Sequence, residues 1–120
     1  MNKKGPLIFI EHIIENIKDI ESFIYGISKE EFIENKEKLN AVVRSLEIIG
    51  EAAKNIPISF KEKHTEVSWR KIVGTRDVII HHFFGVDLDL IWDTIKKDIP
   101  ILKNQVEKIK EKLIKEEIVK

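Results

Sequence analysis

The sequence predicts an all-α fold, an up-and-down bundle of four to five helices, from two observations. Apolar residues recur at three- and four-residue steps along nearly the whole chain, as they do on the buried side of a helix. Alternation of apolar and polar residues, which is typical of a strand, nowhere reaches a useful length. The 120 residues suffice for one hydrophobic core, so we expect a single helical domain spanning residues 1–120.

The first half of the chain predicts two long helices joined by a short one. Pro6 fits the first turn of the first helix, which ends at Tyr25-Gly26. Ser28, followed three residues later by Glu31, forms a capping-box pattern that opens the short helix. A longer helix follows and stops at Pro57. The apolar stripes of the two long helices are Ile10, Ile13, Ile14, Ile17, Ile20 and Ile24 in the first, and Leu39, Val42, Val43, Leu46, Ile49, Ala53 and Ile56 in the second.

The second half predicts three further helices. The stretch from Ser59 to Val67 is polar and irregular, with room for one helical turn. Ser68 is then expected to cap a helix that Gly85 ends, and Asp87 to cap the next one. Pro100 fits the first turn of a last helix. The three apolar stripes are Trp69, Ile72, Val73, Ile79 and Ile80, then Leu88, Ile91, Trp92, Ile95 and Ile99, and finally Leu102, Val106, Ile109 and Leu113.

Composition and charge exclude several classes of protein. Lys and Arg together number 21, as do Asp and Glu, so the chain has no net charge with which to attract nucleic acid at long range. Any contact with RNA must therefore come from a local patch. The absence of cysteine excludes disulfides, thiolate zinc sites and cysteine nucleophiles.

No motif in the sequence indicates a metal, a nucleotide loop or a membrane. The histidines do not have the spacing of a metalloprotease site, and no calcium loop or glycine-rich phosphate loop is present. The apolar run from Leu7 to Ile10 is too short to span a bilayer, and Glu11 and His12 interrupt any signal-peptide core. We therefore expect a cytoplasmic protein without a membrane partner.

The segment from Gly74 to Asp87 contains the residues that suggest chemistry. On a helical wheel at about 100° per residue, Arg76 lies about 20° from Trp69, in the middle of the apolar face. A guanidinium in such a stripe is costly unless it is paired or the stripe opens onto a cleft or partner. Asp77 and His81 lie four residues apart toward the edge of this face, so the carboxylate can orient the imidazole. The sequence thus predicts a polar corner of Arg76, Asp77 and His81 beside a hydrophobic surface.

The same spacing is compatible with structural roles. Arg76 could form a buried ion pair, and the pair of Asp77 and His81 could stay on the helix surface without acting on a substrate. Spacing alone leaves both interpretations open.

Other polar and aromatic residues are assigned structural roles. His12 and His64 are expected at the surface, and Glu47 and Glu51 on a solvated side of their helix. Trp69 is expected in the core.

The pattern Arg76-Asp77-x3-His81 resembles the signature of the HEPN superfamily: an arginine, a polar residue, a short spacer and a histidine. Longer blocks in the same order extend the resemblance over nearly the whole chain and are similar to the HepT-like branch. These blocks are Leu46 to Ala53, Trp69 to Arg76, Phe84 to Asp87, Leu90 to Trp92 and Asp98 to Leu102. The resemblance implies a HEPN-like helical domain that forms a two-fold homodimer.

The resemblance also implies a function. HepT-like proteins are toxins of type II toxin–antitoxin systems that cleave RNA without metal or other cofactor, and their partner is a minimal nucleotidyltransferase antitoxin. Arg76 and His81 would be catalytic, in a cleft that both subunits line, and Asp77 would support them. Apart from the resemblance, the position of His82 on the opposite flank of the helix and the aromatic ring of Phe83 make both residues candidates for contacting RNA or the subunit interface.

Position 83 departs from the family pattern. In the family a tyrosine at this position receives a nucleotide from the antitoxin, which silences the toxin. Phe83 has no hydroxyl, so that control cannot act here. Inhibition would have to be steric, or the modified group would have to lie elsewhere.

Two other functions remain open from the sequence. One is a non-catalytic HEPN module that binds nucleotide or presents a substrate to a nucleotidyltransferase, with Arg76 and His81 only contacting phosphate. The other is a structural dimer with Arg76 in an interface ion pair. Zero net charge favours these two interpretations, whereas the order of the motifs favours the endoribonuclease.

Overall fold

The computed structural model describes the backbone of residues 5–84 and 87–119, and within these ranges all side chains except those of residues 76, 78, 80–84, 118 and 119. The described backbone is helical and contains no strand, so the predicted all-α fold is confirmed. The α-helices are α1 (Pro6–Ile24), α2 (Lys29–Glu34), α3 (Lys36–Asn55), α4 (Ile58–Lys63), α5 (Trp69–Phe84), α6 (Leu88–Asp93) and α7 (Ile99–Val119), and a π-helical segment, η1 (Thr94–Asp98), joins the last two.

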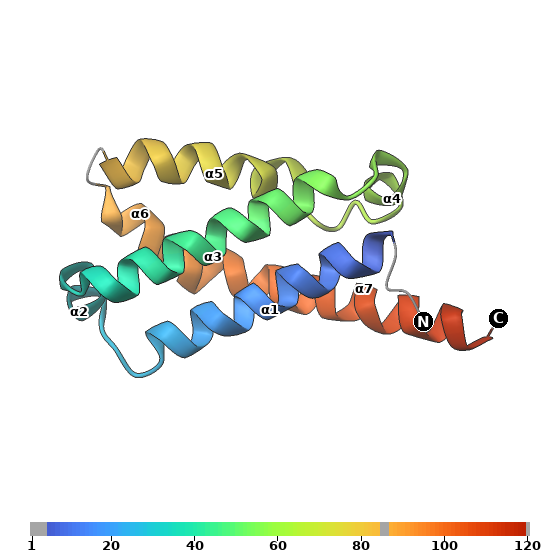
Figure 1. The fold of residues 1–120 in the computed structure, drawn as a ribbon, viewed down its shortest axis with the longest axis horizontal. Coiled ribbons are helices and arrows are strands. Elements are labelled where there is room, and N and C mark those ends of the chain that lie inside the picture. The colour runs from blue at the N-terminus through green and yellow to red at the C-terminus, as the bar shows by residue number, and fades with distance from the viewer. Residues whose placement is uncertain (1–4, 85–86, 120) are drawn as a thin grey trace.

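The long helices α1, α3, α5 and α7 form the up-and-down bundle, and α2, α4 and α6 are short connectors (Figure 1). Helix α1 packs against α3 and α7, and α3 packs in turn against α5. Helix α6 contacts α5 and leads the chain back to α7. Viewed down the shortest axis, α5, α3 and α1 lie side by side, and the described part of the molecule measures 50 × 26 × 23 Å.

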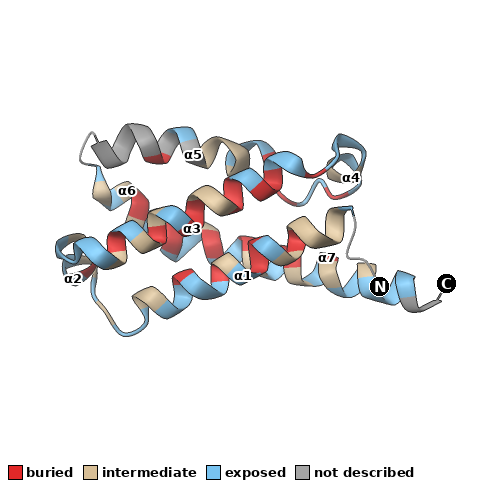
Figure 2. Ribbon diagram, viewed as in Figure 1, coloured by how far each residue is buried: buried red, intermediate tan, exposed pale blue. Residues whose placement is uncertain are grey.

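Isoleucine dominates the core, as the periodicity predicted. In Figure 2 the buried residues of α1 and α3 fall on the sides that face their neighbours. Helix α1 buries five isoleucines with at most 4% of their surface exposed. None of the helices in the described ranges combines the length and apolar character needed to cross a membrane.

The predicted caps of α2 and α6 are confirmed. Ser28 accepts a hydrogen bond from the backbone of Glu31, and the backbone N–H of Ser28 donates to the Glu31 carboxylate at 3.0 Å. This backbone hydrogen bond, helped by the Ser28 hydroxyl, lowers the pKa of Glu31. Asp87 accepts from Leu90 N at 3.2 Å and begins α6.

The break between α2 and α3 comes from a cap that the sequence analysis did not identify. Asn35 ends α2, and its side chain accepts a hydrogen bond from Lys38 N at 3.0 Å, which makes it the N-cap of α3. In the stretch predicted to be irregular, α4 supplies the helical turn and the chain then loops from His64 to Ser68.

The prediction that Pro100 lies in the first turn of the last helix is confirmed, because Pro100 is the second residue of α7. The sequence analysis did not predict that α7 would follow α6 and η1 without a break in the helical backbone. A proline cannot donate to the carbonyl four residues earlier. Here the helix widens just before Pro100, where Ile99 N donates to the Thr94 carbonyl in a π-helical bond. The wider turn lets the helix continue through the proline.

Ion pairs on the surface join helices that are distant in sequence. Lys103 Nζ on α7 donates to the two carboxylate oxygens of Glu21 on α1 at 3.1 and 3.0 Å, and this hydrogen bond raises the pKa of Lys103. Lys29 Nζ lies 2.8 Å from Asp89 Oδ1 and connects α2 to α6. Such exposed pairs contribute little to stability, so the isoleucine core holds the bundle together.

Replacing a core isoleucine should therefore cost far more than replacing an exposed one. Ile17→Ala removes a side chain with 0% exposure at the centre of α1, and we expect a loss of about 2–5 kcal/mol in the free energy of unfolding. Ile58→Ala changes a residue that is 74% exposed and should have almost no effect. Urea unfolding of both variants measures the difference, and equal losses would contradict the packing described here.

Candidate functional site

The start of α5, which carries the predicted motif, is fixed by a buried tryptophan. The Ser68 carbonyl accepts the first helical hydrogen bond, from Ile72 N at 3.1 Å, as expected for an N-cap residue. Trp69 is 8% exposed, and its Nε1 donates to the His64 carbonyl at 2.9 Å. The loop before α5 is also attached to α7, because Gln105 Nε2 donates to the Glu66 carbonyl at 2.7 Å.

The prediction that His64 lies at the surface is wrong. Its exposed fraction is 8%, and its ring stacks in a tilted arrangement on Phe60 with 4.4 Å between centroids. Its Nδ1 lies 3.7 Å from Glu66 Oε2. The sequence could not show this burial because the contacts arise from the fold of the α4–α5 loop. His12 is exposed, as predicted.

The described residues of α5 test the predicted helical wheel. Trp69 and Ile79 are buried, and Ile72 and Val73 pack against the core while remaining partly exposed. Asp77 is exposed, as expected for a residue at the edge of the apolar face. The apolar face of α5 therefore packs inward, and the helix runs unbroken through the whole motif to Phe84.

The side chains of the other motif residues lie outside the described part of the chain. The backbone of Arg76, His81, His82 and Phe83 belongs to α5, and no position is assigned to their side chains. Their roles therefore stay predictions. Gly85, predicted to end the helix, falls in the gap at residues 85–86.

A groove runs along the side of α5 that faces η1. Its volume is about 220 Å³, and its apolar wall includes Ile79 and Ile91. Lys71 Nζ on α5 lies 3.3 Å from Asp98 Oδ2 at the end of η1. Thr94, the first residue of η1, donates its hydroxyl to the Leu90 carbonyl at 2.9 Å. The groove is mostly apolar and has one ion pair beside it, which suits a packing boundary between α5 and η1.

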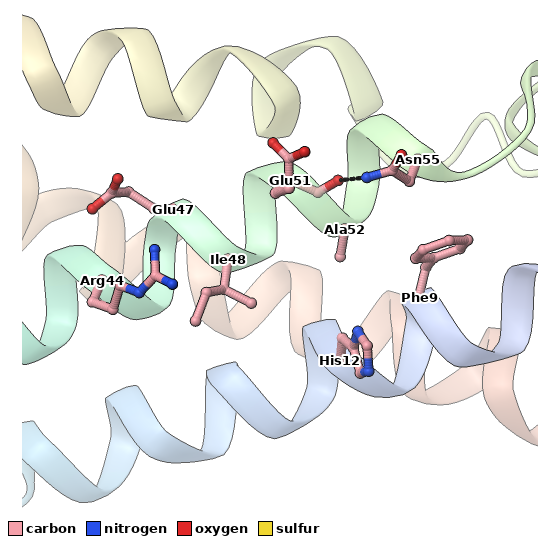
Figure 3. Close-up of a pocket in the computed structure, with 8 residues that line it drawn as sticks. All are labelled: Phe9, His12, Arg44, Glu47, Ile48, Glu51, Ala52 and Asn55. Atoms are coloured by element: carbon pink, nitrogen blue, oxygen red, sulfur yellow. Dashed lines mark hydrogen bonds between the residues drawn. The ribbon is translucent and has the colours of Figure 1, made fainter.

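A larger pocket, of about 360 Å³, opens between α1 and α3 (Figure 3). Figure 3 shows Glu47 and Glu51 directed toward α5 and His12 rising from α1. The guanidinium of Arg44 lies between Glu47 and Ile48 in this view. We call this surface the α1/α3 face, and the residues that line the pocket are Phe9 and His12 from α1 and Arg44, Glu47, Ile48, Glu51, Ala52 and Asn55 from α3.

Sequence analysis placed Glu47 and Glu51 on a solvated side and did not single out Arg44. The structure shows an exposed Arg44 and Glu51 with a half-buried Glu47, so this side is polar but also forms a pocket wall. The sequence feature that could have indicated this pocket is Ile48, because it is an apolar residue on the charged side of α3. The α1 residues of the pocket lie more than 30 positions earlier in the chain, so periodicity could not connect them to α3.

The α1/α3 face carries both signs of charge. Arg44 offers a fixed fork of donors, whereas Glu47 and Glu51 offer carboxylates from the same helix. Such a surface suits a partner with matching alternation of charge better than it suits a polyanion. Within the ranges that the structure describes, no three His, Asp or Glu side chains are grouped so that they could hold a metal ion.

A family model and several related proteins indicate the same family for this chain. A family model described as ribonuclease HepT-like matches residues 13–109. A protein from Caldanaerobacter subterraneus subsp. tengcongensis, named as an RNase candidate, is 47% identical over 109 residues, which cover 91% of this chain and 97% of that protein. A protein from Thermococcus cleftensis, named as a probable ribonuclease HepT, is 48% identical over 108 residues, which cover 90% of this chain and 98% of that protein.

A third relative is longer than this chain. It comes from Methanocaldococcus jannaschii and is named as a gamma-glutamylcyclotransferase and RNase candidate. It is 42% identical over 113 residues, which cover 94% of this chain and 51% of that protein. No solved structure gives a significant match.

The hydrogen bond that anchors α5 can be tested directly. Trp69→Phe keeps an aromatic ring but removes one of the two donors to the His64 carbonyl, which still accepts from Val67 N at 3.3 Å, so we expect a loss of about 0.5–1.5 kcal/mol in the free energy of unfolding. Hydrogen exchange should also become faster in the first turns of α5. Protection unchanged at α5, despite correct folding by circular dichroism, would show that this bond does not fix the helix start.

Proposed function

The chain belongs to the HepT-like ribonuclease family, and from this membership we propose that it is a metal-independent endoribonuclease, the toxin of a type II toxin–antitoxin system. Arg76 and His81 are its catalytic residues and act in a cleft that two subunits share. The observation that carries the proposal is the motif Arg76-Asp77-x3-His81 within a chain that matches the family from residue 13 to 109.

The local structure supports this proposal. Helix α5 is continuous through the motif, so Arg76 and His81 lie about 7.5 Å apart along one helix axis. Asp77 is exposed and precedes His81 by four residues, which brings the two positions onto neighbouring turns of the same side. The Asp77 carboxylate can then hold the imidazole in one tautomer.

The chemistry fits these residue types. Cleavage begins when the 2′-hydroxyl loses its proton to a base and its oxygen attacks the adjacent phosphorus. The bond from phosphorus to the 5′-oxygen then breaks, and an acid protonates that oxygen. An imidazole can accept a proton or donate one, so the two His81 side chains of a dimer would supply one base and one acid. Arg76 donates to the phosphate oxygens on which charge develops.

The motif residues should be essential, and an exposed residue on another helix should not. We expect His81→Gln and Arg76→Ala to lower the rate of RNA cleavage by about 100-fold or more, because each removes a proton donor or a phosphate ligand. Lys112→Gln, which changes an exposed residue of α7, is the control and should retain most of the activity. The assay follows cleavage of a labelled RNA with purified protein in the presence of EDTA.

Each outcome of this assay decides between functions. Undiminished cleavage by both motif variants would refute the catalytic assignment, and loss of all activity in EDTA would refute metal independence. RNA binding without cleavage by the wild-type protein would identify a non-catalytic binding module.

The partner implied by the proposal is a nucleotidyltransferase antitoxin, but Phe83 cannot receive a nucleotide. We expect the antitoxin to restore growth of cells that produce this chain without attaching any group at position 83. Mass spectrometry of the peptide that contains Phe83, taken from co-produced protein, should give the unmodified mass. A nucleotide adduct on that residue's peptide, localised to position 83, would contradict this prediction.

A further inference from the structure

One side of α5 carries a line of residues that leads to the motif. At about 100° per residue, four positions fall within about 60° of one another on the helical wheel. These positions, which we call the α5 stripe, are Arg70, Gly74, Asp77 and His81. Arg70 and Asp77 are exposed, whereas Ile79, on the opposite side of the helix, is buried. The α5 stripe therefore lies on the outer side of the helix and connects its first turn to the histidine of the motif.

Gly74 is the unexpected member of the α5 stripe. Glycine is unfavourable in the interior of a helix, because it loses more conformational freedom on folding than other residues do. The backbone of Gly74 is helical and does not need a positive φ. Among the residues that the structure describes, no atom lies within 4 Å of the place that a Cβ would occupy. The packing of this chain therefore does not require a glycine here, and the helix backbone is open to close approach by another molecule.

The two adjacent cations at the start of α5 differ in their surroundings. Lys71 Nζ lies 3.3 Å from Asp98 Oδ2, so its charge is neutralised on the side that faces η1. Arg70 lies about 100° away around the helix. Within the described ranges its guanidinium has no hydrogen bond and no ion pair. An exposed guanidinium without a partner presents its fork of donors to an outside anion, and phosphate oxygens match this geometry.

The end of the bundle where α5 begins is the basic part of this neutral chain. The stretch from residue 54 to residue 71 runs from the last turn of α3 through α4 to the first turn of α5, which lie at one end of the molecule (Figure 1). It has five basic residues against two acidic ones, Lys54, Lys61, Lys63, Arg70 and Lys71 against Glu62 and Glu66. This local excess of positive charge attracts a polyanion to the end of the α5 stripe that is remote from His81.

We propose that the α5 stripe is the track along which a single RNA strand lies. Arg70 binds a phosphate that flanks the cleaved bond, and the bare backbone of Gly74 lets the strand lie close to α5 between Arg70 and His81. The inference rests on the proposed function, to which it adds a phosphate subsite outside the catalytic motif. Arg70 is a binding residue and takes no part in proton transfer.

The spacing along the helix gives Arg70 this separate role. Arg70 and His81 are eleven residues apart, which corresponds to about 16 Å along the axis of α5. An arginine side chain is much shorter than this distance, so Arg70 contacts a different phosphate from the one beside His81. Contacts to flanking phosphates hold the strand in register and supply affinity, but they do not act on the reacting atoms. Loss of Arg70 should therefore weaken binding and leave the chemical step unchanged.

Binding of a labelled single-stranded RNA with 2′-O-methyl groups tests the track, because this strand keeps its phosphates but lacks the nucleophile for cleavage. We expect Arg70→Gln to raise the dissociation constant about fivefold or more at low salt, and to lower the slope of log affinity against log salt by about 0.7, as for one lost phosphate contact. Lys71→Gln is the matched control, since it removes the same charge from the other side of α5. It should change the dissociation constant by less than about twofold.

Gly74→Gln tests the close approach of the strand. Glutamine is neutral and favours a helix, so the midpoint of urea unfolding should equal or exceed that of the wild type. Its side chain would cover the backbone of α5, and we expect the dissociation constant for the methylated strand to rise about fivefold or more. A glycine needed only for folding would give a lower unfolding midpoint instead. Circular dichroism and sedimentation velocity verify that each variant keeps the fold and the oligomeric state of the wild type.

Several results would overturn the track. The wild type could fail to bind the methylated strand, or Arg70→Gln could leave affinity and salt slope unchanged. Equal losses in Arg70→Gln and Lys71→Gln would show that only overall charge matters. A Gly74→Gln variant that binds as tightly as the wild type, or that loses binding together with a change in sedimentation, would remove Gly74 from the track.

Cleavage of an unmodified strand by the same samples separates this inference from the proposed function. We expect Arg70→Gln to raise KM about fivefold or more and to change kcat by less than about twofold. A wild type that cleaves RNA and is indifferent to Arg70→Gln keeps its RNase assignment and loses the track. A protein that binds the methylated strand through Arg70 but never cleaves the unmodified one keeps the track and loses the RNase assignment.

Discussion

The packing of α3 between α1 and α5 is the constraint on which the rest of the structure depends. The buried side of α3 includes the small residues Ser45, Gly50, Ala52 and Ala53. Small side chains let neighbouring helix axes approach closely, so both neighbours are held by one helix. One side of α3 therefore positions the pocket shared with α1, and another positions the motif on α5. A shift of α3 would move both surfaces together.

Most of the fold could be predicted because its determinants are local. The isoleucine stripe of α1 and the caps at Ser28 and Asp87 follow from spacing and side-chain chemistry within a few residues. The π-helical turn before Pro100 could not be predicted, because the proline rule marks a helix start or a kink equally well. The burial of His64 could not be predicted either, because it depends on Phe60 and on a loop that the tertiary structure folds back.

The motif on α5 and the pocket between α1 and α3 also differ in whether the sequence could predict them. The motif on α5 was found from sequence because its residues lie within two helical turns and match a known order. The α1/α3 pocket was missed because it combines His12 with residues of α3 that become neighbours only when the two helices pack. On α3 itself, the positions of Arg44 and Glu51 predict only an ordinary solvated side of the helix. Ile48 is the apolar residue among these charged positions.

The zero net charge is the strongest physical objection to an enzyme that acts on RNA. A neutral chain gains little from long-range attraction to a polyanion, so it must bind phosphate through a few well-placed groups. In the proposed function that group is the guanidinium of Arg76, whose fixed fork of donors matches phosphate oxygens at short range. The exposed Asp77 beside it balances the charge of Arg76, so recognition of RNA at this motif would depend on geometry and not on an excess of positive charge.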